Sequence, residues 1–201
     1  MKIQHGSGNV AYQLLKGSSM SPMIKLPLGL EYALLGLIRH GASYPYEIHQ
    51  QLERTAVLHL VWHIKQRQTY ALLERLEEEG CLVSTTQQQG RRPPRRLLQL
   101  TEHGLERFQH WVVLPVEHGR DFRQEFMAKL FFAQREGGAD MSTLIQRQVQ
   151  ACQEWLGEFQ RQLIGIPDTQ PLDRLVIQFR IGQLDATLLW LEQCKDTLKA
   201  T

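Results

Sequence analysis

Arginine is concentrated in one short loop, residues 90–96, where four arginines lie within six positions and no acidic residue separates them. A guanidinium group forms paired hydrogen bonds with phosphate oxygens, so such a cluster is typical of nucleic-acid binding. Pro93 and Pro94 stiffen the loop, which is more than solubility alone requires. We interpret it as a contact to phosphates or to the minor groove; the alternative is a solvated loop tip. The residues assigned to this contact are Arg91, Arg92, Arg95 and Arg96.

The segment that precedes this loop, residues 65–79, has the leucine spacing of a helix and an unusual order of charge. Its bases lie at the N-terminal end and its acids toward the C-terminal end, which opposes the helix dipole. This order places positive charge at the end that would enter a major groove, where arginine pairs with guanine and glutamine with adenine. The alternative is the solvated face of an ordinary helix. The residues assigned to DNA contact are Lys65, Arg67, Gln68, Thr69 and Tyr70.

The elements that must position these residues have the order of a winged helix-turn-helix domain. Apolar periodicity and β-branched residues predict helices at 28–39, 43–54, 65–79 and 103–113, and strands at 82–86 and 96–100. The two prolines are expected in the loop between the strands, and Thr101 is expected to cap the helix that follows. The apolar segment 55–64 either extends the second helix or forms a tight connection. We therefore predict a mainly α fold with a two-stranded wing.

The C-terminal part is expected to be wholly helical, with helices at about 122–134, 141–164 and 172–198. Apolar residues of the 141–164 helix recur every three or four positions, as in a coiled coil. The last helix has two apolar stripes and so needs two partners. The 141–164 helix can cover one stripe, and a second subunit is the natural partner for the other. The residues assigned to dimerisation are Ile145, Val149, Leu156, Phe159, Phe179, Gly182, Ala186 and Leu189.

A chain of 201 residues is long enough for one large domain or two small ones. We divide it into a leader at 1–23, a winged-helix domain at 24–115 and a helical dimerisation domain at 116–201. The leader is expected to be an artificial or poorly ordered segment, or else to hold a short native helix at 9–16. Residues 24–113 carry eleven Lys and Arg against nine Asp and Glu, whereas residues 114–201 carry ten against twelve. This weak asymmetry suits a nucleic-acid module joined to an assembly module.

Several other function classes have little support. The three cysteines lie far apart without a CxxC spacing, which argues against a disulfide framework or a cysteine zinc site and favours a cytoplasmic protein. His59 and His63 lack the intervening glutamate of a zinc-protease motif, so we expect no metal site. No catalytic constellation or phosphate-binding glycine loop stands out, so we predict neither an enzyme nor a cofactor. No apolar run reaches the roughly 18 residues that cross a bilayer.

Together these elements resemble the PadR family of winged-helix transcriptional regulators. The matching segments are Leu28–Leu37, Pro45–Ile48, Tyr70–Gly80, Gly90–Arg96 and Leu100–Gly104. The resemblance covers about residues 28–113, and the order and spacing of its motifs make it specific. The chain departs from the family around Tyr70: Arg67, Gln68 and Thr69 stand where the family usually has Gly-Ser and an apolar residue, and Ala71 replaces a proline. The family's base contacts therefore do not transfer directly.

The resemblance implies a regulator that binds double-stranded DNA as a homodimer. We expect a sequence-specific repressor that acts on a palindromic site, with recognition helices in successive major grooves about 34 Å apart. Members of the family often respond to aromatic compounds, and a pocket for such an effector is assigned to Trp111, Phe126 and Trp155. Their helical spacing is otherwise that of plain core. The alternative function is a winged-helix adaptor that binds protein rather than DNA.

Overall fold

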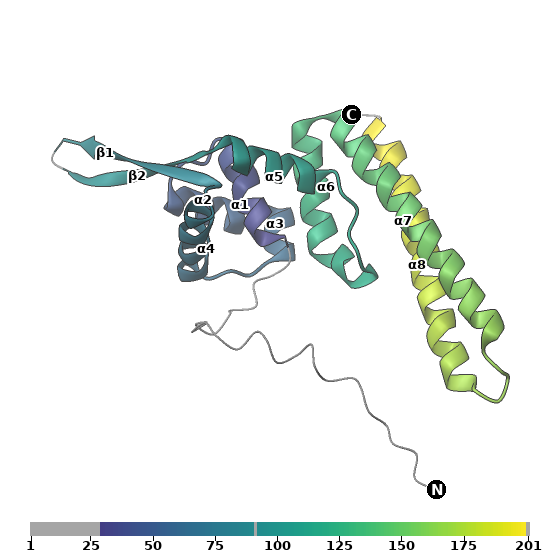
Figure 1. Ribbon diagram of the computed structural model, residues 1–201. Helices are drawn as coiled ribbons and strands as arrows, with labels where there is room; N and C mark the ends of the chain where they lie inside the picture. Colours follow the sequence, from purple (N-terminus) through teal and green to yellow (C-terminus); the bar gives the residue numbers. More distant parts are fainter. Residues whose placement is uncertain (1–28, 91, 200–201) are drawn as a thin grey trace, which may run out of the picture.

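The molecule is elongated, with a two-stranded wing at one end and a pair of long helices at the other (Figure 1). The computed structural model describes residues 29–90 and 92–199, apart from the side chains at 89, 92, 93, 198 and 199. The predicted leader at 1–23 and Arg91 therefore lie outside the described residues. The fold is mainly α with one two-stranded antiparallel sheet, as the sequence predicts.

Two groups of elements follow one another along the chain. The winged half, residues 29–112, contains α1 (Leu30–Arg39), α2 (Pro45–Arg54), α3 (Ala56–Val61), α4 (Gln66–Glu78), β1 (Leu82–Gln89), β2 (Arg92–Leu100) and α5 (Glu102–Val112). The helical half, residues 119–199, contains the 3-10 helix η1 (Gly119–Arg123), α6 (Glu125–Glu136), α7 (Gly138–Gly165) and α8 (Pro171–Lys199). Residues 113–118, which we call the linker, join the two halves.

Local sequence explains several of the element ends. Pro45 begins α2, where its missing N–H leaves no helical bond unmade. Thr101 caps α5 as predicted, because its hydroxyl oxygen accepts a hydrogen bond from the Gly104 N–H at 3.0 Å. Gly137 separates α6 from α7 with a φ of 137°, a value that favours glycine. This single residue is enough for the break, so α7 begins at Gly138 rather than near residue 141.

The wing is longer than predicted, and the prediction that both prolines lie in its loop is wrong. The strands pair from Leu82 opposite Leu100 to Gln89 opposite Arg92, so positions 93 and 94 belong to β2. The register shifts between Gln87 and Gln89. Such an irregularity tolerates residues without an N–H because the ladder is already interrupted there.

Two further segments differ in detail from the predicted elements. Residues 55–64 do not extend α2: they contain the separate short helix α3, followed by extended backbone. The helix expected over 122–134 is divided into η1 and α6. In both places a continuous apolar pattern spans two elements, because periodicity alone does not locate a short interruption.

The core centres on α1 and extends into the helical half. Leu34 and Leu35 of α1 are fully buried. A Cβ at Gly36 would lie 2.6 Å from the Phe132 ring of α6 and 2.7 Å from the Phe108 ring of α5, so only glycine allows this approach. The two rings pack edge to face with their centroids 5.7 Å apart. Helix α6 therefore belongs to the same core as the winged half.

Helices α7 and α8 form an antiparallel hairpin that extends away from this core (Figure 1). Leu184 and Leu191 of α8 are buried, which places one of its two apolar stripes inside the chain. None of the helices in the described part of the chain combines the length and apolar character that a membrane span requires.

Candidate nucleic-acid interface

The N-terminal end of α4 presents its basic residues to solvent. Lys65 and Arg67 are exposed. The side-chain oxygen of Gln68 accepts a hydrogen bond from the Lys65 backbone N–H at 3.1 Å. Gln68, which was predicted to contact DNA, thus caps the start of α4. The Tyr70 hydroxyl accepts a hydrogen bond from the Gln66 side-chain amide at 3.3 Å. Two exposed basic residues thus stand at a helix end whose glutamine and tyrosine have local partners.

The assignment of Thr69 to DNA contact is wrong. Its side chain is fully buried, and its hydroxyl oxygen lies 3.2 Å from the Nδ1 of His49 in α2. Helical spacing explains this position: Thr69 precedes Leu72, Leu73 and Leu76 by three, four and seven residues, so it lies on the face that packs inward. Its hydroxyl joins α4 to α2 and cannot reach a base.

The wing arginines whose side chains are described differ in their surroundings. Arg95 is exposed, and its guanidinium carbon lies 5.7 Å from the centre of the Tyr44 ring. Arg96 is half-buried and forms an ion pair with Glu77 of α4. Arg95 therefore remains available to a ligand, whereas Arg96 joins the wing to the helix beside it. Arg92 lies in β2, and its side chain is outside the part of the chain that the structure describes.

The consecutive acids at the C-terminal end of α4, residues 77–79, suggest an exposed helix terminus, but two of them have partners in other elements. Glu77 accepts hydrogen bonds from Arg96 and from the Ser84 hydroxyl of β1. Glu79 lies 2.7 Å from the Arg107 guanidinium, and this hydrogen bond raises the pKa of Arg107. These contacts hold the negative charge at the base of the wing, away from Lys65.

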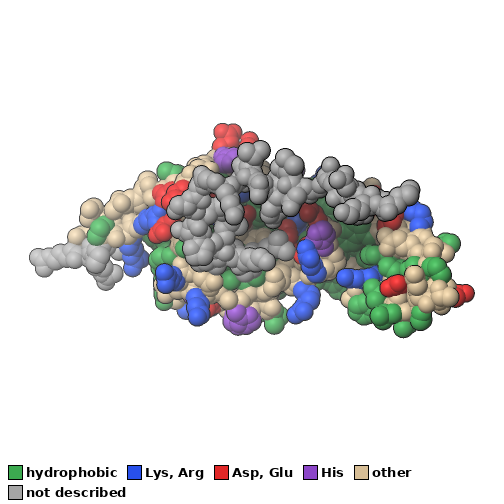
Figure 2. Space-filling view, turned by 60° about the horizontal axis from the view of Figure 1, so that its bottom comes forward, with side chains coloured by type: hydrophobic (Ala, Val, Ile, Leu, Met, Phe, Trp, Pro, Cys, Tyr) green, Lys and Arg blue, Asp and Glu red, His purple; other side chains and the backbone are tan. Residues whose placement is uncertain are grey.

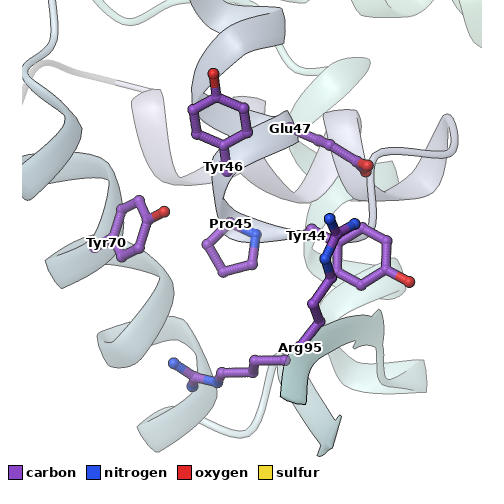
Figure 3. Close-up of a pocket in the computed structure, with 7 residues that line it drawn as sticks. Tyr44, Pro45, Tyr46, Glu47, Tyr70 and Arg95 are labelled. Atoms are coloured by element: carbon purple, nitrogen blue, oxygen red, sulfur yellow. The ribbon is translucent and has the colours of Figure 1, made fainter. Parts of the chain in front are cut away.

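A groove of about 410 Å³ connects the three elements that carry the candidate residues. Figure 3 shows its walls: Pro45 and Tyr46 come from the start of α2, Tyr70 from α4 and Arg95 from β2, with Tyr44 beside them. The Tyr44 hydroxyl donates a hydrogen bond to the Gln87 side chain of β1 at 2.8 Å, which ties the wing to the start of α2. Tyr70 of α4 and the exposed Arg95 of the wing thus border one groove.

Sequence reasoning missed Tyr44 and Tyr46 as site residues. The available signal was the Tyr-Pro-Tyr order at a helix start, because Tyr46 lies away from the helix face that Ile48 and Leu52 bury. Their proximity to β2 depends on how the wing folds back, which no local pattern indicates.

Two of the three predicted effector residues, Trp111 and Phe126, lie within the packed junction between the two halves. Trp111 is 5% exposed, stacks on Tyr32 at 5.2 Å, and donates a hydrogen bond from Nε1 to Glu125 at 2.8 Å. Phe126 is fully buried against Trp190 of α8, at 5.9 Å between ring centres. Trp155 of α7 is half-buried. These contacts are those of core aromatic residues, and their assignment to an effector stays a prediction.

The predicted dimer residues divide between the inside and the outside of the chain. Ile145 is 2% exposed and packs in the chain's own core, so its assignment to a subunit contact is wrong. Val149, Leu156 and Phe159 of α7 are half-buried and pack against the same core. The α8 residues are exposed; with Leu175 they form what we call the outer stripe, namely Leu175, Phe179, Gly182, Ala186 and Leu189.

The outer stripe is a large apolar surface. Leu175, Phe179 and Leu189 are 62%, 65% and 65% exposed. Figure 2 shows hydrophobic side chains gathered at the end of the molecule farthest from the wing. Exposed apolar surface of this extent is typical of a protein-protein contact.

A metal centre has no support in the described part of the chain. The His59 and His63 rings lie 4.7 Å apart, and no group of three or more His, Cys, Asp or Glu that could hold a metal ion occurs among the residues described.

Comparison with known proteins places these surfaces in context. Residues 34–110 match the transcriptional regulator PadR-like family, and residues 122–199 match the family described as virulence activator alpha C-term. The negative transcriptional regulator PadR of Bacillus subtilis (strain 168) is 29% identical over 131 residues, which span 65% of this chain and 71% of that protein. The crystal structure of Bacillus subtilis PadR in complex with operator DNA is similar, with 24% identity, a TM-score of 0.41 and coverage of 84% of this chain and 98% of that one. The Vibrio cholerae virulence activator AphA gives 18% identity, a TM-score of 0.37 and coverage of 85% and 98%.

Proposed function

Because residues 34–110 form a domain of the PadR-like family of transcriptional regulators, we propose that this chain is a sequence-specific DNA-binding repressor that acts as a homodimer. The observation that carries the proposal is the groove between α2, α4 and β2, whose walls include Tyr70 of α4 and Arg95 of β2. Lys65 and Arg67 lie exposed at the start of the same helix, α4. The end of α4 enters a major groove, and the wing meets the adjoining phosphates. The curated relative is a negative regulator, which supports repression over activation.

A second copy of the chain is the occupant of the outer stripe. Gly182 and Ala186 lie in its middle, where small side chains let two helices approach closely. Burial of each large apolar side chain contributes roughly 1.5–3 kcal/mol, so covering Leu175, Phe179 and Leu189 in both subunits supplies a stable contact. A two-fold dimer presents two α4 helices to a palindromic site with half-sites about 34 Å apart.

The test of DNA binding is a salt titration against random duplex, followed by selection of bound sequences from a random library. Affinity that falls steeply as salt rises is expected, because several arginines and lysines displace counterions from phosphates. Selected sequences should contain a paired inverted motif. A folded protein that binds no duplex at low salt would instead favour the adaptor function.

Base readout by α4 is tested separately from helix capping. Gln68→Glu keeps the oxygen that accepts from the Lys65 N–H but loses the amide N–H₂ that adenine requires. The selected motif should lose its preference at one position by roughly 1–3 kcal/mol, with no loss of thermal stability. An unchanged motif would remove Gln68 from the set of reading residues.

The proposal includes release of DNA by a small aromatic effector. Its support is the concentration of aromatic rings along α6, which contact Trp111 of α5 and Trp190 of α8. A ligand that binds better to one arrangement of the two halves shifts the population toward it. Aromatic acids are screened for release of a labelled duplex, and a compound that binds without changing duplex affinity would contradict this part.

A further inference from the structure

The linker between the two halves is held by side chains from two different helices. From α6, the Lys129 ammonium group donates a hydrogen bond to the Leu114 carbonyl oxygen at 2.9 Å. From α7, the side-chain oxygen of Gln148 accepts a hydrogen bond from the Val116 N–H at 2.8 Å. Two backbone groups that lie two residues apart thus have fixed partners, although the linker itself forms no regular element.

Both of these side chains are buried, which is unusual for their types. Lys129 is 2% exposed and Gln148 is fully buried. A buried polar group costs free energy unless it is hydrogen-bonded, so their partners determine where they can lie. Burial lowers the pKa of Lys129, and the Glu125 carboxylate, 3.1 Å away, opposes that shift. Exposed polar residues would not impose such a constraint.

The same contacts continue into the winged half. Glu125 also accepts the hydrogen bond from the Trp111 indole N–H at 2.8 Å, and the Lys129 ammonium lies 5.4 Å from the centre of the Trp111 ring. Trp111 belongs to α5, the last helix before the linker. One set of polar contacts therefore joins α5, α6 and the linker, and a separate hydrogen bond joins the linker to α7.

We propose that Lys129 and Gln148 are positioning residues that prevent the linker from pivoting and so set the separation of the two α4 helices in the dimer. The inference rests on the proposed function, because it concerns two subunits on one DNA site. Helix α8 carries the outer stripe and packs on α7, so a rotation at the linker would move each winged half relative to the subunit contact. A fixed linker makes the distance between half-sites a property of the fold rather than of the DNA.

The experiment compares duplexes in which two selected half-sites are moved apart or together by one or two base pairs. Lys129→Met and Gln148→Met keep approximate side-chain volume and remove the bonds to the linker. Each variant should remain a dimer with unchanged affinity for a single half-site, while its discrimination between the best spacing and its neighbours falls by roughly threefold or more. A variant that is merely less stable would not change this ratio.

The matched control is Gln150→Met, which makes the same change on the exposed face of α7, where the Gln150 amide donates a hydrogen bond to Glu154. It should leave spacing discrimination at the wild-type value. Discrimination that is equal in all variants would overturn the inference while leaving DNA binding intact. A wild-type protein that binds no duplex, or is monomeric, would count against the proposed function instead.

Hydrogen exchange on the wild-type protein decides the question where a buried variant fails to fold. The Val116 amide should exchange as slowly as amides in the middle of α7, because its partner Gln148 lies in the core. Exchange of Val116 as fast as that of an exposed loop amide would overturn the inference without any substitution.

Discussion

The winged half and the α7–α8 hairpin differ in where they place apolar and charged side chains. In the winged half Leu34, Leu72 and Leu76 are at most 2% exposed. Its charged residues form ion pairs across elements, such as Arg107 with Glu79. The hairpin instead leaves the outer stripe in solvent, while its described ion pairs join near neighbours in sequence, as Arg161 and Glu158 do. The winged half buries its apolar side chains within the chain, together with α6, whereas the hairpin has the surface of a unit that needs a partner.

The largest expected effect is loss of the dimer. Phe179→Glu places a charge in the middle of the outer stripe, where a second subunit would have to desolvate it. Affinity for the full palindromic site should fall by roughly 100-fold, and sedimentation should report a monomer with unchanged helix content. Gln109→Glu, the same kind of charge change on the exposed face of α5, should leave both measurements at wild-type values. A dimeric Phe179→Glu protein would remove the basis of the comparison.

Close packing in the winged half is tested by adding one methyl group. In Gly104→Ala the new Cβ would lie 2.1 Å from the Cys81 carbonyl oxygen, so backbone must move, and urea denaturation should show a loss of about 3 kcal/mol. In Gly157→Ala of α7 the nearest atom is a flexible Arg161 side chain at 3.9 Å, so the helix should gain roughly 0.5–1 kcal/mol. Equal changes in both variants would show that the two regions are packed alike.

The two described wing arginines should separate binding from stability. Arg95→Ala should weaken binding to every duplex alike and reduce the salt dependence by about one counterion, with an unchanged melting temperature. Arg96→Ala also removes the partner of Glu77, so it should lower stability as well, by at most about 1 kcal/mol for a pair that is one-third exposed. Identical melting curves for the two variants would contradict the different roles assigned to these residues.

The smallest effect concerns pH at the contact between α1 and α6. His40 packs on Phe132 and lies 2.9 Å from Glu136, with Arg39 and Arg135 nearby. Burial lowers its pKa from 6.5, and Glu136 only partly offsets this. His40 therefore binds a proton more readily in the unfolded chain than in the folded protein. The stability that neutral His40 contributes above pH 6.5 is lost as the pH falls below that value. His40→Gln should reduce the change in melting temperature between pH 7 and acidic pH. An unchanged dependence of melting temperature on pH would exclude His40 as its cause.

Much of the winged half could be predicted because its signals are local. The leucine spacing of α4, the threonine cap of α5 and the arginine cluster of the wing each involve residues within a few positions of one another. The helical period of α4 also places Thr69 on the buried face. The assignment of Thr69 to DNA was wrong because it considered the polar side chain and not this period. The different surroundings of Arg95 and Arg96 could not be predicted from local sequence, because the partner of Arg96, Glu77, belongs to α4 and not to the wing.

By itself the sequence determined the helices, the wing, the basic charge at one end of α4 and the two apolar stripes of α8. These depend on backbone hydrogen bonding and on periodicity, which neighbours along the chain decide. Only the tertiary structure decided which polar groups meet: Tyr44 and Arg95 at the groove, and Lys129 and Gln148 inside the linker contacts. Lysine and glutamine favour water, so their burial follows from long-range packing that brings an unpaired backbone group within reach of each.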